Sequence, residues 1–516
     1  MMKKAVSLML AMAIAGTALT GCSNSGGTSA GGGTASAAGA QSGSSGTPYT
    51  VKLAFPTIYG NPKNQTEVEA AVNKIALKKA NVQVKFEPIA YAQWTQEMNL
   101  MLASNEKLDI TVTLPNTYST YVSQGKFVQM DDLLKQYGQG ITKAFNDLSP
   151  DFLKTFQING KTYGVAQMRE FGSSWGVCMR KDIADEFKMD TAKTYSLNEM
   201  EAILKQIKAK YPNMTPVMPQ TGGSTNSMIS FLQSWDTLGD GFGVLMNGGT
   251  DTPLKVVDLY ETDEYKSWVK EMRDWYQEGL IAKDSATTSD AATSRVKAGT
   301  LAGFVANMKP GFETQEEALT GKQMADFNIV EAHSSTSDVA SFMYGIPVNC
   351  KDTASTMKFL NLLYTDADIM NLMCYGIEGT DYEKTSTENV IKATSSPKWY
   401  QGLAWMMGNE FIAKVMEPNR STIWEETKTF DKTNKKSNAM GFTFDETPVK
   451  TAVTSVTNVK NQYMASLEDG LVDPDTVLPK FIAALKANGM DTIVKEKQSQ
   501  LNKWLEANNH SDWAVK

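Results

Sequence analysis

The sequence predicts an α/β protein built from at least two folded units of similar style. Its 516 residues are about three times the length of an ordinary domain. Between residues 50 and 114, segments that alternate apolar and polar side chains take turns with segments of helical periodicity. The same alternation begins again after residue 160. Because strands separated by helices usually pair in parallel, each unit is predicted to be a sheet with helices on its faces.

The first unit is predicted to be a β-α-β-α-β succession. Asn64, followed three residues later by Glu67, has the pattern of a helix-capping pair. Apolar residues then recur at helical spacing as far as residue 79. The predicted elements are a strand at 50–55, a helix at 64–79, a strand at 82–86, a helix at 94–104 and a strand at 108–114.

The second unit is predicted to follow a tight hairpin. Asn159 and Gly160 favour a two-residue turn because both tolerate positive φ. Ser196 with Glu199 predicts another capped helix. The expected elements are strands at 175–179, 301–306, 327–332 and 342–347, with helices at 196–210 and 352–363.

Composition describes a soluble globular chain and excludes several function classes. Apolar residues make up 41% and charged residues 21%, and the formal charge is −7. An acidic chain without basic clusters is not expected to bind nucleic acid or anionic lipid through its surface charge. Since the only histidines are His333 and His510, a histidine-rich metal site is excluded and His333 is the one interior imidazole base. We therefore expect no metal, no cofactor and no catalytic residue.

The N-terminus predicts export and lipidation. Two lysines precede an apolar run, residues 5–19, which is shorter than the roughly 20 residues of a membrane span. The run ends in the sequence LTGC at residues 19–22, which resembles the lipobox of bacterial lipoproteins. In those proteins the cysteine thiol is diacylated and the signal is cut before it. Residues 1–21 are therefore expected to be a signal peptide, and Cys22 the lipidated N-terminus.

A flexible tether is expected at residues 22–48. This segment consists mainly of Gly, Ser, Ala and Thr and has no large apolar residue, so it cannot form a core. A random coil of this length reaches about 28 Å, which lifts a folded head clear of a membrane surface.

Three cysteines remain after Cys22. They are Cys178, Cys350 and Cys374, and their odd number argues against a disulfide framework. Buried free thiols are expected, with a bond between Cys350 and Cys374 as the alternative.

Motifs in the middle of the chain resemble extracellular solute-binding proteins of the maltose-binding type. The stretches NGKTYGV at 159–165 and WGVCMRKD at 175–182 are similar to the segment in which that family crosses between its lobes. Ala166 stands where proline is common in the family. YGIP at 344–347 resembles the returning crossing.

Later motifs resemble the lipoprotein branch of that family from Gram-positive bacteria. YGIEG at 375–379 and GNEF at 408–411 are similar to this branch, with Glu410 where glutamine is more usual. GFTFD at 441–445 and the closing helices look like the extra C-terminal domain of unknown function that the branch carries.

The resemblance implies a two-lobe flytrap with the periplasmic-binding-protein type II fold, which closes over ligand by hinge motion. It implies lobe 1 from residues 49–165 and 296–345, and lobe 2 from residues 166–295 and 346–440. A helical C-terminal extension is implied at 441–516.

The function that the resemblance implies is capture of an oligosaccharide for import. A monomeric receptor, anchored by lipid at the outer face of the cytoplasmic membrane, would deliver the sugar to permease subunits. A separate ATPase would drive transport, because this chain has no G-x-x-x-x-G-K loop. GDGFG at 239–243 lacks the third glycine of a dinucleotide fingerprint.

Candidate ligand residues are expected beyond the strand ends and at the lobe crossing. A sugar ring needs aromatic plates and planar polar partners, and open α/β sheets bind ligands beyond the carboxyl ends of their strands. Trp405 and Trp424 are expected to be the main plates, and Glu378 with Asp381 to accept hydroxyls unless they form a solvated turn. The full expected set is Tyr59, Asn61, Asn116, Tyr118, Arg169, Trp175, Trp235, Asn307, Glu378, Asp381, Trp405 and Trp424.

Two other functions stay open. A peptide receptor of the same fold would need an acid and a base for the peptide termini. An anchored glycoside hydrolase needs only two suitably spaced carboxylates, and 57 acidic residues make chance pairs certain. By contrast, Tyr265, Trp268, Met272 and Trp275 recur at helical spacing and are expected to be packing.

Replacing Cys22 with alanine should release the protein from the membrane, because two or three acyl chains supply the anchoring free energy. Partitioning of the wild type and of Cys22→Ala between detergent and aqueous phases measures this. A Ser25→Ala variant in the tether is the control and should stay in the detergent phase. If Cys22→Ala also stays there, the lipoprotein hypothesis is wrong.

Overall fold

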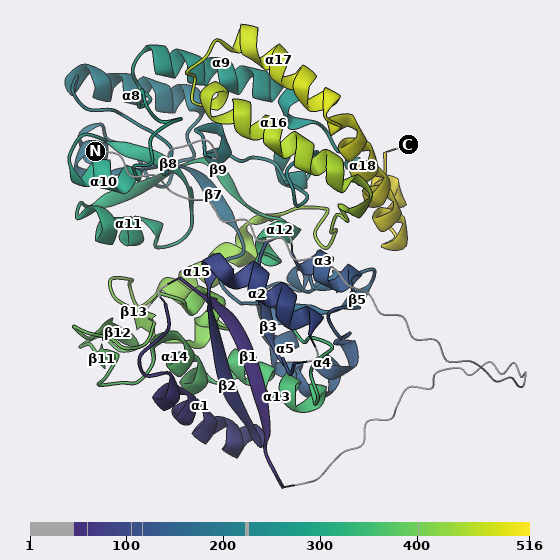
Figure 1. Cartoon of the computed structure of the whole chain (residues 1–516). Helices are drawn as coiled ribbons and strands as arrows, with labels where there is room; N and C mark the ends of the chain where they lie inside the picture. The colour runs from purple at the N-terminus through teal and green to yellow at the C-terminus, as the bar shows by residue number, and fades with distance from the viewer. Residues whose placement is uncertain are drawn as a thin grey trace, which may run out of the picture. The chain divides into compact units, whose positions relative to one another are not determined.

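The computed structural model describes residues 46–58, 60–104, 106–115, 117–221, 226–400 and 402–515. The expected signal peptide, Cys22 and nearly all of the tether lie outside these residues. From Thr47 onward the chain forms one compact unit. It consists of two lobes, here named lobe 1 and lobe 2 (Figure 1). Each lobe has its own large hydrophobic core. Lobe 1 is built on residues 51–171 and 339–413, and lobe 2 on residues 177–327 and 442–505.

Lobe 1 contains the expected β-α-β-α-β succession at its start. The first two strands pair in parallel from Tyr49 opposite Val82, and a bridge between Leu53 and Ile110 joins them to a further three-stranded sheet. The elements are β1 (Tyr49–Thr57), α1 (Gln65–Ala80), β2 (Val82–Ala90), α2 (Tyr91–Ala103), β3 (Thr111–Thr113), α3 (Tyr118–Ser123), α4 (Asp131–Tyr137), α5 (Gln139–Leu148), α6 (Asp151–Lys154), β4 (Gln157–Ile158), β5 (Lys161–Thr162), β6 (Gly164–Ala166), β10 (Met343–Gly345), α13 (Thr353–Thr365), α14 (Ala367–Tyr375), β11 (Tyr382–Lys384), β12 (Val390–Ala393), β13 (Val415–Met416) and α15 (Ile423–Thr433).

Lobe 2 is a four-stranded sheet covered by helices. Its strand order is β14-β9-β7-β8, with β7 antiparallel to both β8 and β9. The elements are β7 (Ser173–Arg180), α7 (Lys181–Glu186), α8 (Leu197–Lys210), α9 (Asp263–Gln277), α10 (Ala292–Lys297), β8 (Gly303–Met308), α11 (Phe312–Thr320), β9 (Met324–Ser334), α12 (Thr336–Val339), β14 (Lys435–Lys436), α16 (Lys450–Glu468), α17 (Pro474–Ala487) and α18 (Met490–Ala507).

Local signals in the sequence explain several of these elements. β4 and β5 form the expected hairpin, with both Asn159 and Gly160 at positive φ. Ser196 and Glu199 form the expected capping box of α8. The cap expected at Asn64 is wrong, because its side-chain amide instead donates a 2.8 Å hydrogen bond to Asp381.

The chain passes between the lobes three times, and the three crossings lie side by side. Ser173 of β7 and Lys435 of β14 are both paired with His333 of β9. Gly172 fits between the Asn434 side chain and the His333 carbonyl, where a Cβ would collide with the amide. The three crossings therefore form one hydrogen-bonded strip between the lobes.

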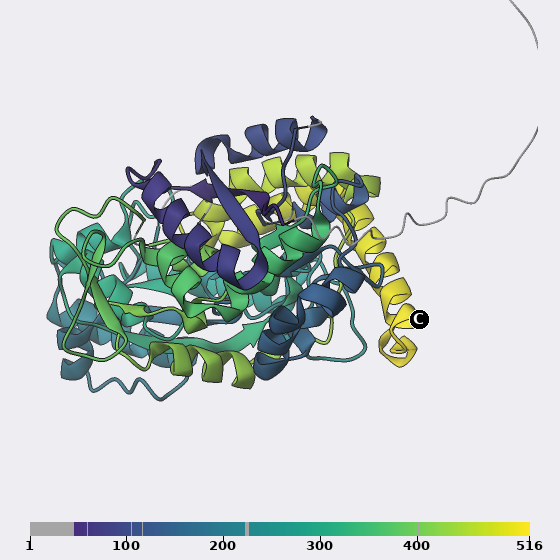
Figure 2. The same cartoon turned by 90° about the horizontal axis from the view of Figure 1, so that it is seen from below.

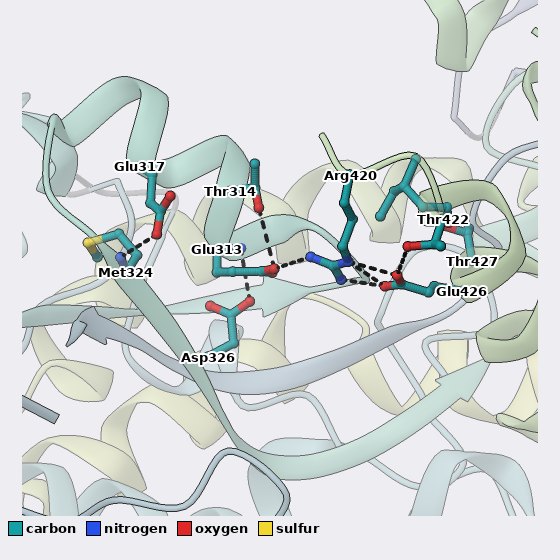
Figure 3. A network of polar contacts seen from close by, with 10 residues as sticks. Glu313, Thr314, Glu317, Met324, Asp326, Arg420, Thr422, Glu426 and Thr427 are labelled. Atoms are coloured by element: carbon teal, nitrogen blue, oxygen red, sulfur yellow. Dashed lines mark hydrogen bonds and ion pairs between the residues drawn. The ribbon is translucent and has the colours of Figure 1, made fainter. Parts of the chain in front are cut away.

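A charged contact away from this strip also connects the lobes. Arg420, in the loop before α15, donates to Glu426 of lobe 1 and, at 2.6 Å, to Glu313 of α11 in lobe 2 (Figure 3). The backbone N–H of Glu313 in turn donates to Asp326 of β9 at 3.1 Å. Arg420 thus connects a helix start in each lobe.

The expected division of the lobes differs from the observed one. Residues 296–334 belong to lobe 2, because β8 and β9 flank β7 along almost its whole length. Residues 344–347 are not a crossing, since β10 lies between β3 and β6 inside lobe 1. Segments distant in sequence thus complete each sheet, which the order of elements alone does not reveal.

The C-terminal extension is helical as expected, but it is part of lobe 2 rather than an appendage. Helices α16, α17 and α18 pack on one another, and α16 and α17 pack on α9 (Figures 1 and 2). Phe481 and Leu501 share a single core with Trp275.

The three cysteines of the described chain are free thiols. Cys178 and Cys374 are buried, and the Sγ of Cys350 lies 3.2 Å from the Thr356 hydroxyl. Among the described helices, none combines the length and the apolar character needed to cross a bilayer.

The aromatic stripe of α9 packs in the core of lobe 2, as expected. Tyr265, Met272 and Trp275 are fully buried. Trp268 is partly buried and stacks on Trp235 with ring centroids 5.6 Å apart. This stripe fastens α9 to the C-terminal helices.

Trp275→Ala should lower the free energy of unfolding by about 3–5 kcal/mol, because the lost indole leaves a cavity. Urea denaturation followed by circular dichroism measures the change. Lys266→Ala, on the exposed face of the same helix, should shift it by less than about 1 kcal/mol. Equal effects of the two substitutions would show that Trp275 does not anchor the core.

Candidate functional site

A cavity of about 280 Å³ opens where the two lobes and the C-terminal segment meet. We name it the interlobe cavity. Lobe 1 contributes Tyr118 and lobe 2 contributes Trp175 and Asn307, while residues 336–341 of the second crossing and 442–444 before α16 complete the wall. A cavity lined by both lobes changes shape when they rotate, so it is the place where ligand binding can be coupled to closure.

Trp175 and Asn307 form the centre of the lobe 2 wall. They are direct cross-strand neighbours on β7 and β8. On its other side, β7 has an irregular register with β9 at Trp175, which is typical of a β-bulge. Bulges re-aim side chains and are frequent at functional sites. The bulge therefore places an indole beside an exposed amide at the cavity.

The indole nitrogen of Trp175 is a buried donor that has no hydrogen-bond partner among the described residues. Such a donor costs free energy unless water or a ligand accepts from it. Its neighbour Asn307 is exposed in a strand whose other residues are buried, so its amide is available to a ligand. An aromatic face with free amide groups is suited to a sugar ring.

A charged cluster lies at the first crossing. Glu170 accepts from Lys309 of lobe 2 at 3.0 Å and from Arg169 at 3.1 Å. Burial alone would raise the pKa of Glu170, but Lys309 and Arg169 outweigh burial and hold the pKa below its ordinary value. Burial and then the Glu170 carboxylate raise the pKa of nearby Glu410. One carboxylate is thus kept ionised and the other is favoured in its neutral form.

Arg169 also connects this cluster to aromatic side chains. Its guanidinium carbon lies 5.6 Å from the ring centres of both Phe342 and Trp405, within cation–π range. The two rings meet edge to face at 4.9 Å. Trp405 is therefore near the crossing, although it does not line the interlobe cavity.

Two further hollows lie elsewhere on the described chain. A hollow of about 140 Å³, here named the C-terminal hollow, includes Trp235 in its lining and shares Gln233, Thr237 and Gly239 with the interlobe cavity. A larger one, of about 470 Å³, lies beside the carboxyl end of β1 and includes Asn61.

The structure separates the residues that the sequence grouped together. Tyr118, Trp175 and Asn307 all line the interlobe cavity. The hydroxyl of Tyr118, however, donates to the Phe156 carbonyl and accepts from the Tyr163 N–H. Tyr59 and Asn116 lie outside the described residues.

Three of the expected residues have structural partners away from the cavity. The Asp381 carboxylate is fully buried and accepts from the Asn64 amide and from three backbone N–H groups. Glu378 forms an exposed ion pair with Lys384. The Trp424 ring donates its N–H to a carbonyl at 2.9 Å and packs on Phe411.

Other lining residues were missed by the sequence analysis. Phe442 and Phe444 belong to the GFTFD motif, from which the sequence analysis predicts only the C-terminal extension. Asp338 caps α12 by accepting from Ser335 at 2.7 Å and faces the cavity from the second crossing. The glycine before Phe442 and the helix-capping pattern around Asp338 were the only signals available.

Comparison with known proteins gives matches over most of the chain. Residues 70–377 match the family described as bacterial extracellular solute-binding protein, and residues 438–506 match a domain of unknown function, DUF3502. A carbohydrate ABC transporter substrate-binding protein of Streptococcus pneumoniae is 26% identical over 454 residues, which cover 86% of this chain and 89% of that one. The polygalacturonan/rhamnogalacturonan-binding protein YtcQ of Bacillus subtilis is 23% identical over 377 residues, 70% of this chain and 72% of that one.

The fold has solved counterparts. The crystal structure of the N-glycan transport solute-binding protein of Streptococcus pneumoniae has a TM-score of 0.77 at 24% identity, and the match covers 89% of this chain and all of that one. Its complexes with Man1GlcNAc and Man5GlcNAc have TM-scores of 0.67 and 0.63. With the two-lobe fold, the three crossings and a family match over more than half of its length, this chain belongs to the bacterial extracellular solute-binding protein family.

Proposed function

We propose that this protein is the substrate-binding component of a carbohydrate ABC importer and holds an oligosaccharide between its lobes. The observation that carries the proposal is the Trp175–Asn307 pair in a cavity lined by both lobes, in which an indole N–H without an acceptor among the described residues lies beside an exposed amide. The names of the relatives, which specify carbohydrate, point to the same class of ligand.

The proposed ligand residues are Trp175 and Asn307 on lobe 2, Tyr118 on lobe 1, and Arg169 with Trp405 at the first crossing. The sugar stacks on the indole of Trp175 and exchanges hydrogen bonds with the Asn307 amide. Rotation about the three crossings then brings the lobe 1 wall onto the bound sugar.

The proposal extends to the cellular setting. The lipobox-like sequence at Cys22 supports a lipid anchor at the outer face of the membrane, with the tether leaving the lobes free to meet a permease. The monomeric receptor gives its sugar to permease subunits, and a separate ATPase supplies the energy. Fragments of polygalacturonan or rhamnogalacturonan and the glycans Man1GlcNAc and Man5GlcNAc, which the names of a relative and of two solved complexes mention, are the first ligands to try.

Binding should raise the melting temperature of the wild type by a few degrees. A ligand at a hundredfold excess over Kd stabilises the native state by about 2.7 kcal/mol, and a chain of this size shifts by only a few degrees for such a gain. A thermal-shift panel of Man1GlcNAc, Man5GlcNAc, galacturonate oligomers and short peptides measures this. Stabilisation by peptides alone would replace the sugar proposal with the peptide-receptor alternative.

Trp175→Ala should weaken sugar binding at least about tenfold, because both stacking and apolar burial are lost. Trp424→Ala is the matched control and should leave affinity within about twofold while it lowers the unliganded melting temperature. Titration calorimetry measures affinity, and circular dichroism the unliganded melt. If Trp424→Ala weakens sugar binding and Trp175→Ala does not, Trp424 is the stacking residue and Trp175 does not belong to the site.

No bound oligosaccharide should be hydrolysed, because the neighbouring carboxyls Glu170 and Glu410 do not line the interlobe cavity and Glu170 is engaged in ion pairs. Neighbouring carboxyls with pKa values shifted in opposite directions are typical of glycosidases, and Glu170 with Glu410 shows that pattern. Glu170, however, is held by Lys309 and Arg169. Chromatography of the sugar after overnight incubation checks this, and shorter products that disappear in Glu410→Gln would identify an enzyme.

A further inference from the structure

We propose that the C-terminal hollow is a second sugar subsite, which takes an additional unit or branch of the oligosaccharide held in the interlobe cavity. This inference rests on the proposed function and assigns a role to the C-terminal helices. Its substrate class is therefore an extended or branched oligosaccharide rather than a disaccharide.

The two spaces are neighbours with a common rim. Gln233, Thr237 and Gly239 line both of them. The interlobe cavity measures about 280 Å³ and the C-terminal hollow about 140 Å³. Small-molecule sites usually span about 300–1,000 Å³, so the interlobe cavity lies at the lower edge of that range and the adjoining hollow adds room for a further ring.

The lining of the C-terminal hollow has the chemistry of a sugar site. Trp235 and Tyr260 supply aromatic surface. Lys460, Met464 and Glu468 recur at intervals of four residues, so a single face of α16 forms the opposite wall.

A carboxylate in the loop that lines the other side of the C-terminal hollow, Asp240, has one oxygen without a partner among the described residues. The Asp240 side chain is only 5% exposed, and its Oδ1 accepts from the Lys497 ammonium and, at 2.8 Å, from the backbone N–H of Phe242. Its Oδ2 has no hydrogen-bond partner within the described part of the chain. A buried acceptor without a donor is costly, and a sugar hydroxyl is a donor of the right kind.

Two further polar groups of the hollow are available to a ligand. Lys460 is partly exposed, and its ammonium forms no ion pair with any described residue and lies 5.8 Å from the centre of the Phe242 ring. Tyr260 packs its ring on Phe481 at 4.8 Å, and its hydroxyl forms no hydrogen bond with the described residues. Both side chains pack on aromatic rings, and their polar ends are left for a ligand of the hollow.

One buried ammonium connects the walls of both spaces. Lys497 of α18 holds Asp240 of the C-terminal hollow and lies 4.8 Å from the ring centre of Phe444, which lines the interlobe cavity. A C-terminal helix therefore fixes side chains on both sides of the shared rim, and this arrangement supports a ligand that occupies both spaces.

Titration calorimetry with a short and a branched probe, Man1GlcNAc and Man5GlcNAc, tests the inference. If the wild type binds only the acidic series, galacturonate dimers and hexamers replace them. Lys460→Met and Tyr260→Phe keep the size of each side chain and remove one polar group. Each should weaken the larger probe about fivefold, the effect of one or two lost hydrogen bonds, and leave the smaller probe within about twofold. Lys450→Met, the same change on the same helix outside both linings, should alter neither.

The outcomes separate this inference from the proposed function. If Lys460→Met and Tyr260→Phe leave the larger probe unchanged, or weaken both probes equally, the second subsite is wrong while the importer function stands. If the wild type binds no oligosaccharide of either series, the proposed function falls and this subsite with it. Selective weakening of the larger probe supports both.

Discussion

The arrangement of both lobes depends on the strip in which three chain crossings lie side by side. Ser173 and Lys435 pair with the same residue, His333, and Gly172 leaves room for the Asn434 amide against the His333 carbonyl. Backbone hydrogen bonds hold the crossings in register, so the proposed rotation of one lobe against the other would take place about this strip. One wall of the interlobe cavity comes from each lobe and a third from the second crossing. The strip therefore sets where these three walls stand relative to one another.

Charge at the junction complements this backbone strip. Glu170 lies between Lys309 of lobe 2 and Arg169, and Arg420 joins a helix of each lobe. Ion pairs whose partners are both largely exposed contribute little to stability. The contribution of an ion pair that is shielded from solvent depends more strongly on its geometry. Glu170 is nearly buried and Arg420 is about half exposed. We therefore expect the Glu170 cluster to fix the position of the first crossing, and the Arg420 contact to yield more easily when the lobes rotate.

The C-terminal helices are an integral part of lobe 2 in this chain. They share one core with α9, and the segment that leads into them contributes Phe442 and Phe444 to the interlobe cavity. The buried pair of Lys497 and Asp240 ties α18 to a loop of the preceding part of lobe 2. Because a buried charge is costly without its partner, the two segments depend on each other for stability, and the extension is at once part of the core and part of the proposed site.

The sequence by itself determined the elements whose signals are local. Alternation at period two, the Asn159–Gly160 turn, the Ser196 cap and the aromatic stripe of α9 each follow from a few neighbouring residues, and the motif order was enough to identify the family. Only the tertiary structure decided which strands share a sheet, since β8 and β10 pair with partners over a hundred residues away. It likewise decided the roles of Asp381 and Trp175. The Asp381 carboxylate is buried and accepts from four donors, whereas the Trp175 indole N–H has no acceptor among the described residues. The residue type alone does not distinguish a ligand residue from a core residue at either position. The physical reason is that hydrogen-bond satisfaction and burial are properties of the packed surroundings, which bring together residues that the sequence keeps far apart.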